Sequence, residues 1–219
     1  INMNILNQVF SKIYVISSYA TQDRLNDLLP FLSKENIECE LVISPKKKYF
    51  KDKNEDELWL GKGAFSLLSG NESIFLKEYY LKSKTFCILE DDIFFDVDYK
   101  NKLNEIVYDI PIDWQILNLG YHVNSSINYK FNSQEKFYKL KDNDFFVGTH
   151  IIGYNYNVVS FLLDKIENNK YPMDTFLNNN LKQINIYTYL NKIFYASSYR
   201  EDECDKNESY KKYKTQIGT

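Results

Sequence analysis

The feature that most constrains this chain is a run of four apolar residues that ends in three consecutive carboxylates. Phe86 to Leu89 are apolar, and Glu90, Asp91 and Asp92 follow directly. A continuous apolar run of this length is typical of a strand buried on both faces, as in parallel sheets covered by helices. Open α/β sheets bind ligands at the carboxyl ends of such strands. The segment therefore predicts a buried strand with an acidic ligand site at its end.

Three adjacent carboxylates repel one another strongly unless a cation compensates their charge. Alternate residues of an extended chain share a face, so Glu90 and Asp92 converge on one point. A hard divalent cation takes oxygen ligands and keeps positions open for substrate phosphates. The alternative is that the acids are solvated or cap a following helix. A Walker B strand looks similar, but the segment at residues 61–63, Gly-Lys-Gly, lacks both the spacing of a P-loop and its following Ser or Thr.

Strand-like and helical segments alternate along the rest of the chain. Short apolar, β-branched or aromatic runs predict strands at residues 12–17, 37–43, 85–90, 114–120, 145–154, 184–190 and 193–198. Helical spacing predicts helices at residues 21–34, 58–81, 99–107 and 158–166. Thr21 is a plausible N-cap of the first of these helices, and Pro30 is expected to kink or break it.

This alternation predicts a single α/β domain with a mainly parallel central sheet flanked by helices. We expect the domain to span residues 1–200 and a charged tail to span residues 201–219. The Lys-rich segment from Ser44 to Glu57 is expected to be a mobile loop, and residues 121–144 a loop or hairpin.

Composition excludes several classes of protein. The chain has 219 residues, of which 44% are hydrophobic, and a net charge of only -3, which argues against disorder. Its 30 acidic residues outnumber 27 basic ones, so a nucleic-acid binder is not expected. The three cysteines lack zinc spacing, and Cys87 is interpreted as core packing. Without a signal peptide or an apolar run near the roughly 20 residues of a membrane span, we expect a soluble, cytoplasmic protein.

Several segments, taken in order, resemble glycosyltransferase family 25, which includes bacterial lipooligosaccharide galactosyltransferases and procollagen galactosyltransferases. Residues 89–93, LEDDI, match the acidic L-E-D-D-V motif of that family. Residues 65–72, FSLLSGNE, resemble the G-C-x-x-S-H segment that begins a helix in the family, with Gly70 where the family has His. In the first matching segment, Ser17 stands where an Asn is common. The other matching segments are Ile13–Ser17 with Asp23 and Arg24, Asp113–Gly120 (D-W-D-x-x-x-L-G), Gly148–His150 (G-x-x-x-Y) and Tyr171–Asp174 (P-x-D).

The resemblance implies a GT-A fold and inverting transfer of a hexose, galactose or glucose, from a UDP-sugar to a hydroxyl of a glycan, glycoprotein or lipid-linked acceptor. It implies that Glu90 and Asp92 hold Mn²⁺ or Mg²⁺. The implied donor-binding residues are Ser17, Arg24 and Asp91.

Inverting transfer needs a general base, and Asp174 is the candidate because the matching family segment has an acid there. Asp144 and Glu72 are the next candidates. The alternative reading of Asp174 is an N-cap of a helix over residues 175–181.

Two further readings remain open for the chain as a whole. One is a catalytically silent module that binds a nucleotide sugar or a glycan on the same fold. The other is an unrelated α/β nucleotidyltransferase or phosphatase that uses the acidic cluster on phosphate. Of the two histidines, His150 is interpreted as a satisfied core residue, and His122 as a loop residue without a visible partner.

Overall fold

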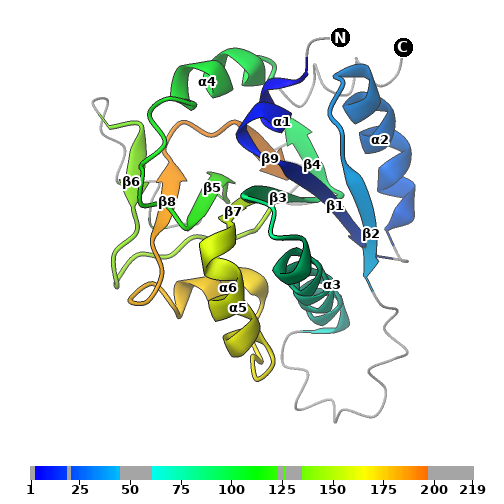
Figure 1. Ribbon diagram of the computed structural model, residues 1–219. Coiled ribbons are helices and arrows are strands. Elements are labelled where there is room, and N and C mark those ends of the chain that lie inside the picture. Colours follow the sequence, from blue (N-terminus) through cyan, green and yellow to red (C-terminus); the bar gives the residue numbers. More distant parts are fainter. Residues whose placement is uncertain (1–2, 19–20, 45–60, 123–125, 127–134, 197–219) are drawn as a thin grey trace.

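The computed structural model describes residues 3–18, 21–44, 61–122, 126 and 135–196. Within these residues, seven strands form one sheet in the order β2-β1-β3-β7-β5-β8-β6, and β4 pairs with β9 in a second, small sheet (Figure 1). The strands are β1 (Lys12–Ser18), β2 (Glu40–Ser44), β3 (Thr85–Glu90), β4 (Ile93–Phe95), β5 (Ile116–Gly120), β6 (Phe137–Lys139), β7 (Ile151–Asn155), β8 (Ile186–Tyr189) and β9 (Phe194–Ala196).

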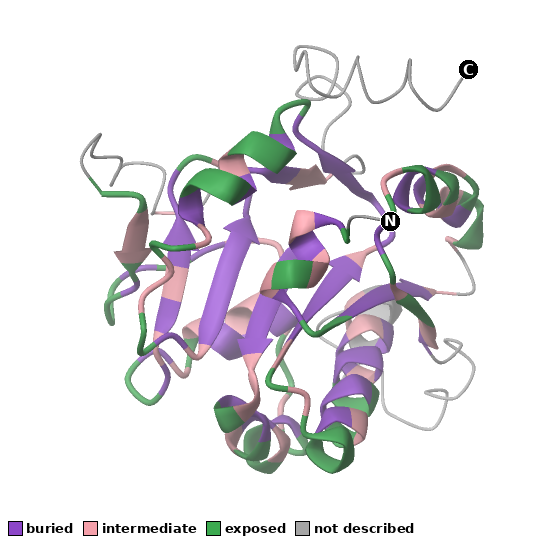
Figure 2. Cartoon of the chain, turned by 45° about the horizontal axis from the view of Figure 1, so that its top comes forward, coloured by how far each residue is buried: buried purple, intermediate pink, exposed green. Residues whose placement is uncertain are grey.

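Helices cover both faces of the large sheet (Figure 1). The helical segments are α1 (Ile5–Val9), η1 (Gln22–Arg24), α2 (Leu25–Lys34), α3 (Gly61–Leu81), α4 (Tyr99–Ile106), η5 (Tyr156–Val158), α5 (Val159–Ile166) and α6 (Met173–Asn178). One apolar cluster packs α1, α2 and α4 against one face, and a second packs α3, α5 and α6 against the other. Both clusters are fully interior, and the central strands are buried along most of their length (Figure 2).

The predicted α/β domain with a mainly parallel central sheet is confirmed. Strands β2, β1, β3, β5 and β8 run in one direction, and β7 and β6 run against them. β1 pairs in parallel with both β2 and β3, which aligns Ser18 with Ser44 and Ile16 with Glu90. The carboxyl ends of these three strands therefore lie together at one edge of the sheet.

Several local predictions need correction. Thr21 makes no side-chain cap bond; it precedes the short η1 turn, and α2 begins only at Leu25. α2 continues through Pro30 without a break, because burial of its apolar face outweighs one lost backbone hydrogen bond. Residues 137–139, expected in a loop or hairpin, form the edge strand β6. The strand expected over residues 145–154 begins only at Ile151.

Some expectations fall on parts of the chain that the structure does not describe. The Lys-rich segment lies outside the described residues except for Ser44, which ends β2. The charged tail, residues 201–219, also lies outside them. Among the described helices, none has both the length and the apolar character that crossing a membrane requires.

Gly70 marks a close approach between α3 and the sheet. A Cβ atom at this position would lie 2.5 Å from both Ile16 Cδ1 and Ser44 Oγ. A larger side chain would have to displace them, so the packing of α3 on β1 and β2 explains why a glycine occupies this position.

Gly153, in the middle of β7, is packed so closely that a larger residue there should destabilise the fold. A Cβ atom there would lie 2.6 Å from Cζ of Phe10, whose ring is fully buried. Because the ring has no solvent-facing side to move into, we expect Gly153→Ala to lower the free energy of unfolding by about 1–3 kcal/mol, measured by urea denaturation. Ile112→Ala is the control, because Ile112 is 100% exposed and should change stability by less than about 0.5 kcal/mol. Wild-type stability of Gly153→Ala would contradict this packing.

Candidate functional site

The predicted acidic cluster forms a tight turn at the edge of the sheet. β3 ends at Glu90, and Asp91 and Asp92 make the turn into β4. Phe86 and Ile88 belong to the cluster under α3, α5 and α6, so by alternation Glu90 faces the same side. Asp91 and Asp92 are each only 8% exposed, which is unusual for carboxylates and means that their charges need partners.

Asp91 is held by donors from the segment that follows β1. Ser17 Oγ donates to Asp91 Oδ2 at 2.6 Å, and Thr21 Oγ1 donates to the same oxygen at 2.5 Å. Arg24 Nη1 lies 3.3 Å from Asp91 Oδ1. These bonds tie the end of β1 and η1 to the acidic turn. The structure thus brings the predicted donor-binding residues together, with Asp91 as their common partner.

A cavity of about 180 Å³ opens beside these residues. Its wall is rich in hydroxyls from the ends of β1 and β2, including Ser17, Ser18, Thr21 and Ser44. Ser44 Oγ is buried and has no hydrogen-bond partner among the described residues. A buried hydroxyl without a partner costs free energy, so the cavity suits a ligand that carries hydrogen-bonding groups. Ser44 was not among the predicted site residues.

His150 joins Glu90 and Asp92 in a cluster that can hold a metal ion. One ligand atom from each of the three residues lies within 4.8 Å of the other two. His150 is 4% exposed, and its Nδ1 accepts or donates no hydrogen bond among the described residues, the Glu90 Oε2 atom lying 3.9 Å away. The interpretation of His150 as a satisfied core histidine is therefore wrong: it is buried, but its nitrogen points into the acidic cluster.

The metal-ligand atoms that this cluster offers suit a divalent cation. Carboxylates suit Mg²⁺ and Mn²⁺, whereas an imidazole favours transition metals, so two carboxylates with one imidazole can hold a divalent cation and suit Mn²⁺ better than Mg²⁺. A metal ligand would also satisfy the buried imidazole nitrogen of His150. We found no other such group of three among the described residues.

Neighbours of the cluster orient its members. Thr149 Oγ1 donates to Glu90 Oε1, and the Glu90 amide donates to the His150 carbonyl at 3.0 Å. Gly148 has φ of 84°, and a Cβ atom there would lie 2.5 Å from Cε1 of His150. Glycine at this position therefore both adopts the left-handed conformation and leaves room for the imidazole.

A second cavity, of about 260 Å³, lies on the other side of the cluster. It shares Leu67, Glu90 and Asp92 with the first cavity, so the two meet at the acids. Asp174 and His122 also line it. His122, assigned to a loop without a visible role, is buried there at 5% exposure.

Asp174 is anchored by backbone amides. Gly148 N donates to Asp174 Oδ2 at 2.9 Å, and Thr175 N donates to Asp174 Oδ1 at 2.7 Å. α6 begins at Met173, so Asp174 lies in its first turn rather than at the N-cap. The prediction that Asp174 is the N-cap residue is thus wrong, because Pro172 holds that position. Its carboxylate nevertheless accepts from the Thr175 amide in the first turn of the helix. The next candidate bases do not line either cavity: Asp144 accepts from Tyr138 and Lys141, and Glu72 is exposed.

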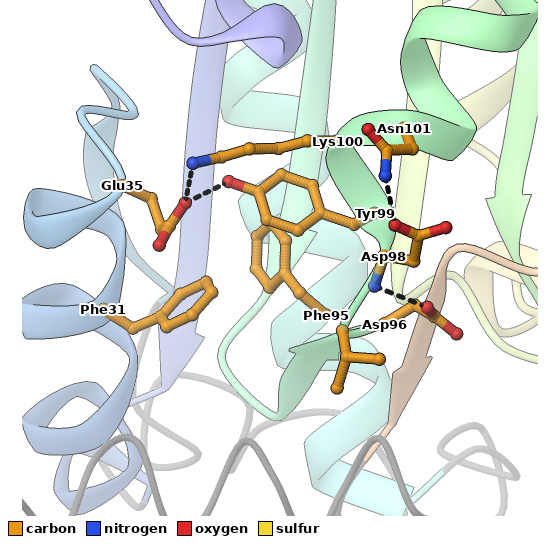
Figure 3. Close-up of a pocket in the computed structure, with 9 residues that line it drawn as sticks. Phe31, Glu35, Phe95, Asp96, Asp98, Tyr99, Lys100 and Asn101 are labelled. Atoms are coloured by element: carbon orange, nitrogen blue, oxygen red, sulfur yellow. Dashed lines mark hydrogen bonds and ion pairs between the residues drawn. The ribbon is translucent and has the colours of Figure 1, made fainter.

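A third cavity, of about 250 Å³, lies between α2 and the start of α4 (Figure 3). The Glu35 carboxylate accepts from Tyr99 Oη and Lys100 Nζ, both at 2.6 Å. Burial acts to raise the pKa of Glu35, but the bonds from Lys100 and Tyr99 outweigh it and leave the pKa lowered. Asp96 is paired with Lys102 at 2.9 Å. The Glu35 bonds thus join the end of α2 to α4, whereas the Asp96–Lys102 pair holds the start of α4.

Comparison with known proteins shows a shared fold. No protein-family model and no curated protein matches the chain. The solved structure of the inositol-1-phosphate CTP transferase from T. maritima matches with a TM-score of 0.52 and 15% identity, over 95% of this chain and 96% of that one. A glycosyltransferase involved in the glycosylation of the major capsid of PBCV-1 matches with a TM-score of 0.49 and 9% identity, over 94% and 98%. A197 from STIV matches with a TM-score of 0.40 and 14% identity, over 81% of each chain.

The first of these matches supports the α/β fold over nearly the whole length of both proteins. At 15% identity it does not carry the activity across. Membership of glycosyltransferase family 25 accordingly stays a prediction.

The bonds to Asp91 predict that it stabilises this edge of the sheet. Asp91→Ala would leave the Ser17 and Thr21 hydroxyls and the Arg24 guanidinium without their acceptor. We expect a loss of about 2–3 kcal/mol in the free energy of unfolding, measured by urea denaturation. Asp23→Ala removes the same charge from an exposed position of η1 and is the control, with an expected change within about 0.5 kcal/mol. Equal changes in the free energy of unfolding of the two variants would show that the bonds to Asp91 do not stabilise the fold.

Proposed function

We propose that this protein is a metal-dependent transferase whose donor is a nucleotide sugar, and more specifically an inverting hexosyltransferase that uses a UDP-sugar. The observation that carries the proposal is the convergence of Glu90, Asp92 and His150 at the junction of two cavities. A substrate with two parts joined by a diphosphate matches this arrangement. The shared transferase fold is consistent with it.

The nucleotide half of the donor is assigned to the cavity beside Arg24. The Arg24 side chain is 38% exposed, and its guanidinium presents planar donors that suit phosphate oxygens. The hydroxyls of Ser17 and Ser18 and the unpartnered Ser44 Oγ line the same cavity. They supply donors and acceptors for a nucleoside. The diphosphate would then lie beside Glu90 and Asp92, where both cavities meet.

The sugar and the acceptor hydroxyl are assigned to the cavity that contains Asp174. In this proposal the Asp174 carboxylate accepts the proton of the acceptor hydroxyl as its oxygen attacks the anomeric carbon, and the bond to the nucleotide diphosphate breaks. Two backbone amides hold Asp174 in place and leave lone pairs on its oxygens. A divalent cation held by Glu90, Asp92 and His150 would partly neutralise the negative charge of the leaving diphosphate. The acceptor is a glycan, a glycoprotein or a lipid-linked glycan.

Two alternatives make different predictions for ligand binding and turnover. A silent binding module binds the nucleotide sugar but neither transfers nor hydrolyses it. A nucleotidyltransferase, the activity named for the T. maritima structure, prefers a nucleoside triphosphate. A thermal-shift panel of UDP-galactose, UDP-glucose, GDP-mannose, UTP and CTP with Mn²⁺, followed by a turnover assay, separates the three. Stabilisation at 100 times the dissociation constant is about 2.7 kcal/mol, which is readily measured.

The metal assignment predicts that UDP binding depends on the cation. We expect the wild type to bind UDP at least tenfold more tightly with Mn²⁺ than with a chelator, and Asp92→Asn to lose this difference while keeping its fold. Isothermal titration calorimetry measures both. Asp164→Asn is the control, because Asp164 is an exposed acid on α5, outside the cavities. Equal UDP affinity of the wild type with and without chelator would remove the metal from the proposal.

The assignment of Asp174 as base predicts a loss in turnover rather than in binding. Asp174→Asn keeps the shape of the side chain, but its single carbonyl oxygen can accept from only one of the two amides, Thr175 N or Gly148 N, that now bond the two carboxylate oxygens. We expect turnover to fall by about 10²–10⁴-fold with little change in donor affinity, and the lost amide bond to lower the free energy of unfolding by about 1–3 kcal/mol. The measurement is steady-state transfer under conditions where chemistry limits the rate. Near-wild-type transfer would show that Asp174 only supports the start of α6.

A further inference from the structure

Arg24 lies between the acidic turn and the first cavity. Its Nη1 atom is 3.3 Å from Asp91 Oδ1 and 3.8 Å from Asp92 Oδ2. Asp91 is not part of the metal-binding cluster, whereas Asp92 is. We propose that Arg24 is the internal counter-cation of the acidic turn, and that a divalent cation takes over this role and releases Arg24 toward an anionic ligand. The inference rests on the proposed metal site and adds a coupling between the cation and the anion.

The two buried acids of the turn need a positive charge nearby. Asp91 and Asp92 are each 8% exposed, and burying two adjacent carboxylates without a positive charge is costly. The Ser17 and Thr21 hydroxyls bond Asp91 but carry no charge. Arg24 does, and its guanidinium remains charged at any relevant pH. It therefore offsets the repulsion within the turn while the cation site is empty.

Arg24 and a bound cation would compete for Asp92. A divalent ion bound to Glu90, Asp92 and His150 would neutralise Asp92 and repel the nearby guanidinium. The weaker contact, at 3.8 Å to Asp92, would be lost first, and the contact at 3.3 Å to Asp91 would remain as a pivot. The Arg24 side chain is 38% exposed and borders the cavity of about 180 Å³, so it has space to turn into that cavity. There it meets the diphosphate of a nucleotide.

The consequence is a specific pattern of metal affinities. If Arg24 competes with the cation, removing its charge must tighten metal binding. We expect Arg24→Gln to bind Mn²⁺ alone about tenfold more tightly than the wild type, or about 1.4 kcal/mol, because the positive charge that repels the cation has been removed. Arg24→Lys keeps the charge and should bind Mn²⁺ nearly as the wild type does.

Titration calorimetry with Mn²⁺ alone, without any nucleotide or turnover, tests this pattern. Thr21→Val is the matched control, because it removes an uncharged donor to Asp91 and leaves the charges unchanged. A second titration, with UDP at saturating Mn²⁺, should show weaker UDP binding by Arg24→Gln than by the wild type. If Arg24→Gln is too unstable to titrate, Arg24→Met keeps the aliphatic stem and must show the same tighter Mn²⁺ binding.

The outcomes separate the inference from the proposed function. Equal or weaker Mn²⁺ binding by the neutral variants would overturn the role of Arg24 while leaving the metal site intact. If Thr21→Val tightens Mn²⁺ binding as much as the neutral Arg24 variants do, the cause is a loosened turn and not the lost charge. This result would also overturn the role of Arg24. A wild type that binds no Mn²⁺ at all would refute the metal site itself, and the role of Arg24 with it.

Discussion

The hydrogen-bonded Asp91 carboxylate is the interaction on which the arrangement of the site depends. It accepts from Ser17, Thr21 and Arg24, which come from the end of β1 and the turn after it. Because Asp91 stands between Glu90 and Asp92, fixing its side chain also fixes the direction of the turn that carries the other two acids. The bond from Ser17 is buried and those from Thr21 and Arg24 are partly buried, so they are stronger and more geometrically restrictive than fully exposed contacts would be.

The antiparallel strand β7 completes the site from the other side. It pairs with β3 so that Leu89 lies opposite Ile151, and the residues just before β7 therefore reach the end of β3. This places His150 beside Glu90 and lets Thr149 bond the Glu90 carboxylate. A parallel strand at this position would have brought its carboxyl end, rather than the segment that precedes it, to the acids. The direction of one strand thus decides that an imidazole joins the cluster.

The two cavities have different linings, which suits the two-part substrate that we propose. On the Arg24 side four hydroxyl side chains line the wall, and on the other side Asp174 and His122 line the cavity that also reaches the acids. Both sides meet at Glu90 and Asp92, where negative charge is concentrated. A cation at this point would make the junction attractive to a diphosphate, and the guanidinium that now faces Asp92 would add to that attraction. In the proposed mechanism, the exchange of Arg24 for a divalent cation beside Asp92 would link binding in the two cavities.

The sequence by itself determined the elements whose signal is local. The apolar run of β3 and its three acids, the long helix α3 and the alternation of strands with helices follow from periodicity over neighbouring residues. They lead to the α/β fold and to Glu90 and Asp92 at a strand end. Only the tertiary structure decided which distant side chains meet there.

His150 reads as a core histidine until the pairing of β7 with β3 places it beside Glu90. Ser44 was predicted to begin the Lys-rich loop, but the structure places it at the end of β2 with its hydroxyl buried in the Arg24 cavity, without a bonding partner among the described residues. Thr21 has the residue type of an N-cap, yet its hydroxyl bonds an acid 70 positions away. The physical reason is the same in each case: strand direction and register are set by packing over the whole sheet, and no window of neighbouring residues contains that information.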